Sequence, residues 1–112
     1  MGKASRDKGN RNERALVVWL AQHVWPYAER RGGGFASADI VGTPGWAVEA
    51  KNQKTWKVQE WWRQTETQAA EGPAGTIPLL VVKRPGKADP GEHLAVLRLA
   101  DLAPLLKEND SD

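Results

Sequence analysis

Residues 38–51 read Ala38-Asp39-Ile40-Val41-Gly42-Thr43-Pro44-Gly45-Trp46-Ala47-Val48-Glu49-Ala50-Lys51. This segment predicts a short apolar strand, a tight turn and a second strand, because Pro44 suits the second position of a type II turn and Gly45 the third. Side chains alternate along a strand, so Glu49 and Lys51 should project from one face. A hairpin between the two strands would bring Asp39 beside that pair.

Two carboxylates and an ammonium in an otherwise apolar segment indicate a binding site. Buried charges are costly unless they are paired or bind a metal. Carboxylate oxygens suit Mg²⁺ or Mn²⁺, and a neighbouring lysine can orient a water or stabilise charge on a phosphate. The alternative is an exposed strand with an ordinary Glu49–Lys51 pair, which is the better interpretation of Glu-x-Lys alone. Asp39, one strand earlier, favours the metal site.

The length of 112 residues predicts a single domain. We expect a flexible basic arm over 1–9, the domain over 10–107 and an acidic tail over 108–112. The chain has no cysteine, which excludes disulfides and thiolate metal sites, and His23 and His93 offer no zinc spacing. It has no apolar run long enough to cross a membrane and no signal-peptide core, so we expect an intracellular, cytoplasmic protein without a membrane partner.

Basic residues are unevenly distributed although the net charge is only +2. The first fourteen residues hold five bases against two acids, and further bases follow the predicted hairpin. Such clusters near a carboxylate site suit a polyanionic partner, while a solvated charged face is the plainer alternative. The Gly32-Gly33-Gly34 loop is not followed by Gly-Lys-Ser/Thr, so it is not a phosphate-binding P-loop and we expect no nucleotide cofactor.

Hydrophobic periodicity predicts the element order αβββαβ(β)α, a mixed α/β (α+β) fold with a central sheet flanked by helices. The expected elements are a helix capped by Asn10 or Asn12 and ending near Val24, strands over 25–31, 38–41 and 46–51, a helix from Trp56 to Glu71 capped by Thr55, an apolar central strand over 77–82, a strand over 93–98 and a short helix capped by Asp101.

Glu13 lies three and seven residues before Leu16 and Leu20, which places it toward the buried side of the first helix. It is therefore a candidate for a third acidic group at the metal site. The alternative is an acid in the first helical turn that only favours the helix dipole.

The string resembles the archaeal-type Holliday junction resolvases of the PD-(D/E)XK, restriction-endonuclease-like, nuclease superfamily. The resemblance covers roughly residues 8–84. Its matching parts are Lys8-Gly9, Asn12-Glu13-Arg14 opening a helix, the Gly-rich loop, Ser37-Ala38-Asp39-Ile40-Val41, Ala47-Val48-Glu49-Ala50-Lys51, a long helix, and Pro78-Leu79-Leu80-Val81-Val82-Lys83.

The resemblance implies a restriction-endonuclease-like fold and a set of site residues. Asp39, Glu49 and the Ala50 carbonyl would bind Mg²⁺, for which Mn²⁺ would substitute, with Glu13 completing the acidic cluster. Lys51 would be the catalytic lysine, and metal-activated water would cut the phosphodiester. The resemblance also implies a DNA-contacting serine, Ser37, and an arginine on the first strand, which either Arg30 or Arg31 could match. The distribution of basic residues adds Lys3, Lys8, Arg11, Arg14 and Lys54 as candidate DNA-binding residues.

The function that follows is a metal-dependent endodeoxyribonuclease that resolves four-way DNA junctions in recombination and repair. Such an enzyme would act as a symmetric homodimer. One alternative is another nuclease of the superfamily that cuts duplex, nicked or flap DNA. The others are a catalytically silent DNA-binding subunit of that fold, or a small basic adaptor whose tryptophans bind a protein partner.

Overall fold

The computed structural model describes the backbone of residues 3–31 and 40–109, and the side chains of residues 11–31 and 40–108. The predicted order of helices and strands is confirmed over these residues, with a short 3-10 helix added before the last strand. The elements are α1 (Lys3–His23), β1 (Glu29–Arg30), β2 (Ile40–Val41), β3 (Trp46–Lys51), α2 (Val58–Glu71), β4 (Ile77–Val82), η1 (Pro90–Glu92), β5 (Leu94–Val96) and α3 (Leu99–Asn109).

The described strands form one mixed sheet in the order β1-β2-β3-β4-β5. Neighbouring strands are antiparallel except β3 and β4, which run parallel. A parallel pair needs a crossover connection, and α2 supplies it. β4 lies inside the sheet between β3 and β5, as its two-sided apolar pattern predicted. The predicted mixed α/β arrangement is therefore confirmed.

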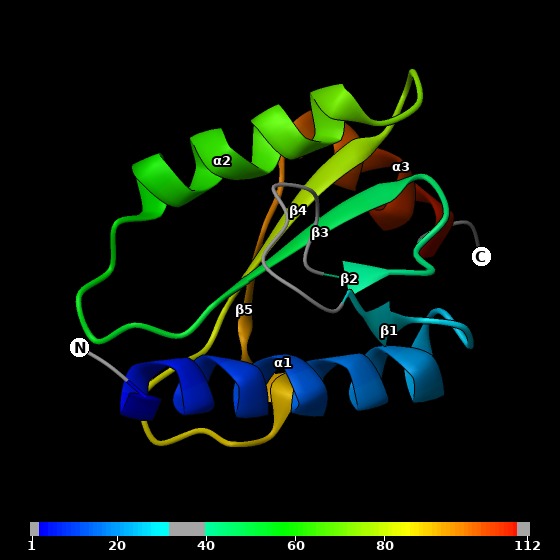
Figure 1. Cartoon of the computed structure of the whole chain (residues 1–112). Helices are drawn as coiled ribbons and strands as arrows, with labels where there is room; N and C mark the ends of the chain where they lie inside the picture. Colours follow the sequence, from blue (N-terminus) through cyan, green and yellow to red (C-terminus); the bar gives the residue numbers. More distant parts are fainter. Residues whose placement is uncertain (1–2, 32–39, 110–112) are drawn as a thin grey trace.

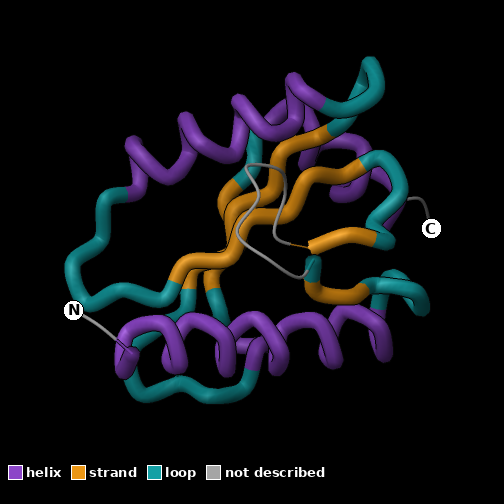
Figure 2. The backbone as a smooth tube through the Cα atoms, viewed as in Figure 1, coloured by secondary structure: helices purple, strands orange, loops and turns teal. Residues whose placement is uncertain are grey.

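The two long helices cover opposite faces of the sheet, α1 below it and α2 above it in Figure 1. Trp61 of α2 packs on Leu80 and Val82 of β4. The buried residues of α2 are Trp61, Thr65 and Ala69, four residues apart, as its predicted apolar stripe requires. In Figure 2 the strands run diagonally through the space between the helices.

The face of the sheet that α1 covers holds the larger cluster of buried side chains. Leu16 and Leu20 of α1 pack there with Ile40 of β2 and with Val48 and Ala50 of β3. Leu16, Ile40 and Val48 are at most 2% exposed. β3 therefore contributes every second side chain to this core, and its remaining side chains face α2.

The N-terminal segment corrects one prediction. α1 begins at Lys3, so residues from Lys3 to Gly9 are helical rather than a flexible arm. Neither Asn10 nor Asn12 caps the helix, because both lie inside it. Lysine, arginine and alanine have good helix propensity. The segment contains only one apolar side chain, that of Ala4, so hydrophobic periodicity had no signal there.

The caps and ends of other elements also differ from prediction. α2 begins after Lys57, which makes no side-chain capping bond, so the Thr55 cap is wrong. Asp101 lies in the first turn of α3, where its Oδ2 accepts a 2.9 Å hydrogen bond from Arg98 Nε. β1 and β5 are shorter than predicted. Among the helices described, none is both long and apolar enough to cross a membrane.

Candidate functional site

The turn between β2 and β3 has the predicted form. Trp46 N donates to the Thr43 carbonyl at 2.9 Å, and Gly45 has a φ of +82°, as the third position of a type II turn requires. The Thr43 hydroxyl, in turn, donates to the Trp46 carbonyl at 2.9 Å. This turn sets the register that pairs Ile40 with Val48, and register decides which side chains of β3 face each helix.

Glu49 and Lys51 project together from the face of β3 that α2 covers. The parallel ladder pairs Glu49 with Leu80 and Lys51 with Val82, the two residues that pack on Trp61. Lys51 Nζ lies 3.5 Å from Glu49 Oε1. The Glu49 side chain is 7% exposed and that of Lys51 is 20% exposed. The predicted pair thus lies on one face, and its carboxylate is buried.

Burial makes this pair costly as a purely structural feature. Removing a carboxylate from water costs several kcal/mol, and apolar residues of similar size often hold a fold at least as well as a buried ion pair. The 3.5 Å separation exceeds the roughly 2.7–2.9 Å of a tight charged hydrogen bond, so the ammonium keeps capacity to donate to another oxygen. A buried carboxylate beside an available ammonium suits a site that takes up a cation and a polar substrate.

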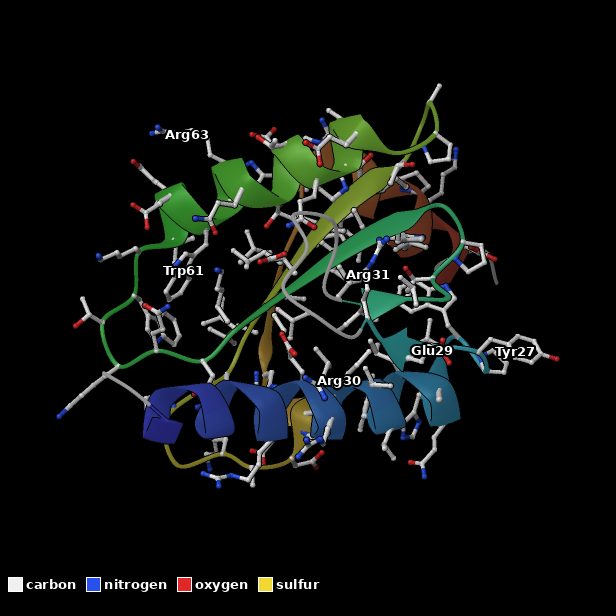
Figure 3. The ribbon with its side chains drawn as sticks, in the orientation of Figure 1. Tyr27, Glu29, Arg30, Arg31, Trp61 and Arg63 are labelled. Atoms are coloured by element: carbon white, nitrogen blue, oxygen red, sulfur yellow. The ribbon has the colours of Figure 1, made fainter. Side chains whose placement is uncertain are left out.

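A second ion pair joins α1 to β1. Arg30 Nε donates to Glu13 Oε1 at 3.3 Å, and Figure 3 places Arg30 beside α1. Arg30 pairs across the ladder with Ile40, so it belongs to the face that α1 covers. Both side chains are partly exposed, at 29% and 20%, so the pair contributes at most about 1 kcal/mol of stability. The expected part of Glu13 in a metal site stays a prediction.

A groove of about 570 Å³ lies where the turn before β3 meets the loop after α2. Arg31, Trp46, Gln68 and Glu71 are among its lining residues. Gln68 Oε1 is buried and accepts no hydrogen bond from any residue that the structure describes. Arg31 points up toward this part of the sheet in Figure 3. The groove is at the end of β3 opposite Lys51, so the Glu49–Lys51 pair does not line it.

The other predicted DNA-binding residues fall into three groups. Arg11 and Arg14 are exposed on α1, and Lys54 is exposed in the connection between β3 and α2. Lys3 and Lys8 lie in α1, but their side chains are outside the described ones. Ser37 lies outside the described residues altogether, as does the predicted metal ligand Asp39.

Of the two main predicted metal ligands, Glu49 lies in the described part of the chain and Asp39 does not. Glu49 fits a cation site, since a buried carboxylate needs a positive partner. Ala50 is buried in β3 and pairs with Val81. In the part of the chain that the structure describes, no three His, Asp or Glu side chains gather, and Asp39 is not in that part. The predicted role of the Ala50 carbonyl stays a prediction.

Three residues near the end of β3 were missed as site candidates. Asn12, Asn52 and Lys83 line a cavity together with Arg11. Asn12 was expected only as a possible helix cap. Asn12 lies at the apolar edge of an amphipathic helix, so its burial could have been predicted. A buried asparagine needs hydrogen-bond partners, and that need could have indicated a polar site.

The loop after β4 holds a titratable group with a shifted pKa. Burial lowers the pKa of His93 from its ordinary value of 6.5, and the positive charge of Lys83 lowers it further. A contact of 3.3 Å between His93 Nε2 and the Lys87 carbonyl acts in the opposite direction, as do the charges of Asp89 and Glu92. The neutral imidazole is therefore favoured in the folded chain.

Comparison with known proteins adds no identification. No protein-family model, curated protein or solved structure matches the chain.

Proposed function

We propose that the chain is a metal-dependent, structure-selective DNA endonuclease of restriction-endonuclease-like fold that resolves four-way junctions. The observation that supports this best is the buried Glu49 carboxylate with Lys51 Nζ 3.5 Å away, on a central strand of a mixed sheet. That pair occupies the Glu-x-Lys positions of the sequence resemblance. The strand arrangement around it, with a hairpin followed by a helical crossover to a parallel strand, is compatible with the proposed fold.

The roles in this proposal follow from the chemistry of each group. Glu49, with Asp39 and the Ala50 carbonyl, would hold Mg²⁺ or Mn²⁺, whose charge would stabilise the phosphate as it reacts. Lys51 donates a hydrogen bond from its ammonium to a water or a phosphate oxygen, which orients that oxygen beside the carboxylate. Glu13 pairs with Arg30 on the face of the sheet that α1 covers, so its proposed part as an additional acid rests on the sequence resemblance alone.

DNA is the proposed partner because the chain carries exposed bases on both sides of the sheet. Arg11 and Arg14 lie on α1, Arg31 lies beside β2, and Lys54 follows β3. Contacts of such residues with phosphates give affinity without reading sequence. Lys3, Lys8 and Ser37 complete the proposed DNA-binding set.

A resolvase must cut two strands of one junction, so we propose a symmetric homodimer. The chain exposes leucines on β5 and α3 that could be covered in such a pair: Leu94 is 44% exposed, Leu99 74%, Leu105 47% and Leu106 55%. Apolar surface of this kind favours association. Sedimentation equilibrium with and without a junction measures the oligomeric state of the chain. A monomer on the junction would contradict the proposed homodimer.

The test of function compares cleavage of a labelled mobile four-way junction with cleavage of matched linear duplex, in Mg²⁺ and in EDTA. We expect paired symmetric nicks on the junction only, and none in EDTA. Glu49→Gln and Lys51→Met should each lower the rate at least about 100-fold, while junction binding persists. The matched controls Glu60→Gln and Lys107→Met change exposed residues of α2 and α3 and should leave the rate unchanged.

Other outcomes separate the alternatives. Equal cutting of junction and duplex would keep the nuclease but remove junction selectivity. Tight binding without cutting in Mg²⁺ or Mn²⁺ would favour the catalytically silent subunit. Retained cleavage by Glu49→Gln would refute the proposed active site.

A further inference from the structure

A cavity of about 430 Å³ lies on the α1 side of the sheet, between α1 and the ends of β3 and β4. Its lining residues are Arg11, Asn12, Ala15, Asn52, Lys83 and Ala88. The parallel strands end together here, since Lys83 N donates to the Lys51 carbonyl at 2.9 Å. Carboxyl ends of parallel strands are frequent ligand sites, because neighbouring chains diverge there and leave a crevice.

The loop after β4 forms one wall of this cavity. It runs under α1 in Figure 1 and returns through η1 to β5. It packs closely on the helix, since a Cβ at Gly91 would lie 3.3 Å from Trp19 Nε1. The loop is thereby held against α1, which keeps Ala88 and Lys83 opposite Arg11 and Asn12.

The lining of the cavity is cationic. Arg11 and Lys83 contribute positive charge, and neither forms an ion pair with any side chain that the structure describes. Among the residues whose side chains the structure describes, the lining includes no acid. The two carboxylates of the adjoining loop are engaged elsewhere: Asp89 Oδ1 accepts from Gly91 N at 2.9 Å, and Glu92 pairs with Lys87 at 3.7 Å.

Asn12 is the second, independent sign of a ligand. It is only 6% exposed, yet its Oδ1 receives no hydrogen bond from the described residues. A buried polar atom left in this state costs about 1–3 kcal/mol. Rotation of the amide by 180° exchanges its oxygen with its NH₂ group, which then donates. An anion held between Arg11 and Lys83 would supply the acceptor for that donor, and Asn52 offers a second amide.

We propose that this cavity binds a phosphate-class oxyanion, and that its natural source is a phosphodiester of the DNA backbone. Two cations and two amide groups line the described part of the cavity, and they match the charge and hydrogen-bonding needs of a phosphate. Lys51 and Val82 face α2, so the next residues along the two strands, Asn52 and Lys83, face α1. This phosphate therefore lies on the opposite side of the sheet from Glu49 and Lys51. It is therefore a positioning site for a phosphate that is not cut. The proposal that the cavity binds an oxyanion does not depend on the proposed function. The proposal that this oxyanion is a phosphodiester of DNA rests on it.

The test uses two probes, inorganic phosphate and a thymidine dinucleotide with one phosphodiester. Both are titrated into the full ¹⁵N-labelled chain while the side-chain amides of Asn12 and Asn52 are followed by NMR. We expect saturable shifts of both amides. Arg11→Gln and Lys83→Gln, whose side chains reach solvent, should each weaken binding roughly tenfold, since each removes one charged hydrogen-bond donor.

Arg84→Gln is the matched control, because Arg84 is exposed next to Lys83 but does not line the cavity. It should bind like the parent chain. Shifts that do not saturate, or equal weakening by Arg84→Gln, would mean general electrostatic attraction and would overturn the site. Saturable binding of inorganic phosphate without any binding of the dinucleotide would overturn the phosphodiester source.

The same variants separate this site from the proposed nuclease. Glu49→Gln should leave the phosphate titration unchanged while it abolishes cleavage. On a longer duplex, Lys83→Gln should reduce the slope of log affinity against log salt by about one unit, and an unchanged slope would show that DNA does not use the cavity. A chain that binds phosphate here but never cuts DNA would refute the proposed function and keep the oxyanion site.

Discussion

Gly42, at the end of β2, is the residue whose replacement tests the fold most sharply. Its φ is +79°, and a Cβ at this position would overlap the carbonyl oxygen of Tyr27 and lie 3.1 Å from the Ala28 Cα. These are backbone atoms of the segment that leads into β1, so no side-chain rotation can relieve the overlap. Gly42→Ala must therefore move β2 away from the start of β1.

The expected cost has two unfavourable terms and one favourable term. A residue other than glycine at positive φ costs about 1–2 kcal/mol. Relieving an overlap in a packed region costs about 1–3 kcal/mol more. Alanine restricts the unfolded chain, which offsets about 0.4–1 kcal/mol. Gly42→Ala should thus lower the free energy of unfolding by about 2–4 kcal/mol, a large share of the 5–15 kcal/mol typical of a domain.

Gly45→Ala is the matched control. Gly45 has a φ of +82°, but no atom lies within 4 Å of its Cβ position. The backbone and entropy terms are therefore the same in both variants, and only the overlap differs. We expect Gly45→Ala to cost about 1 kcal/mol. Urea unfolding followed by tryptophan fluorescence measures both variants under the same conditions.

The difference between the two variants in the free energy of unfolding measures the cost of the overlap at Gly42. A loss at least about 1 kcal/mol greater for Gly42→Ala would support the close approach of β2 to the segment before β1. Equal losses would refute that approach, and with it the position of β1 that brings Arg30 to Glu13.

Further predictions concern the core, the loop after β4 and the Glu49–Lys51 pair. Trp61→Ala should cost about 3–5 kcal/mol because Trp61 is 1% exposed. Trp56→Ala, at 39% exposure, should cost at most about 1 kcal/mol in the same urea assay; equal costs would contradict the burial of Trp61. The lowered pKa of His93 means that its neutral form stabilises the fold. That stability is present above pH 6.5 and is lost as the pH falls through the folded pKa. His93→Asn should therefore flatten the decline in the free energy of unfolding below pH 6.5. An unchanged decline would refute the lowered pKa of His93. Lys51→Leu should lower stability by about 1–3 kcal/mol because it removes the ammonium beside a buried carboxylate, whereas the double variant Glu49→Leu/Lys51→Leu should recover that loss. A double variant less stable than Lys51→Leu would show that the pair is kept for stability.

Local chemistry explains why the centre of the fold could be predicted. The turn before β3 depends on Pro44 and Gly45 alone, and the alternation of β3 depends on its own residues. The stripe of α2 likewise appears as buried residues at the helical period, around Trp61. Each of these signals is contained in one segment, so no knowledge of its neighbours was needed.

The start of α1 and the phosphate cavity could not be predicted in this way. The first turns of α1 have almost no apolar side chains, so their helicity depends on propensity, which is a weak signal. The cavity depends on Asn52 and Lys83, which follow two strands that are adjacent only through the α2 crossover. Its other wall, the loop after β4, is held against α1 where Gly91 approaches Trp19. Such tertiary contacts between distant segments leave no periodic trace in the sequence.

The alternation of β3 links the stability of the fold to the chemistry of the site. Val48 and Ala50 lie in the core under α1, so the strand cannot shift by one residue without burying Glu49 there instead. The same core therefore fixes Glu49 and Lys51 on the α2 face, beside Leu80 and Val82. On that face α2 covers the sheet and the Glu49 side chain is only 7% exposed, and the ammonium is what makes that burial tolerable. An antiparallel edge strand would hold the same Glu-x-Lys sequence in solvent, where the two charges would form an ordinary surface pair. Burial on the face that α2 covers, more than the three-residue motif, is thus what distinguishes this pair as a candidate site.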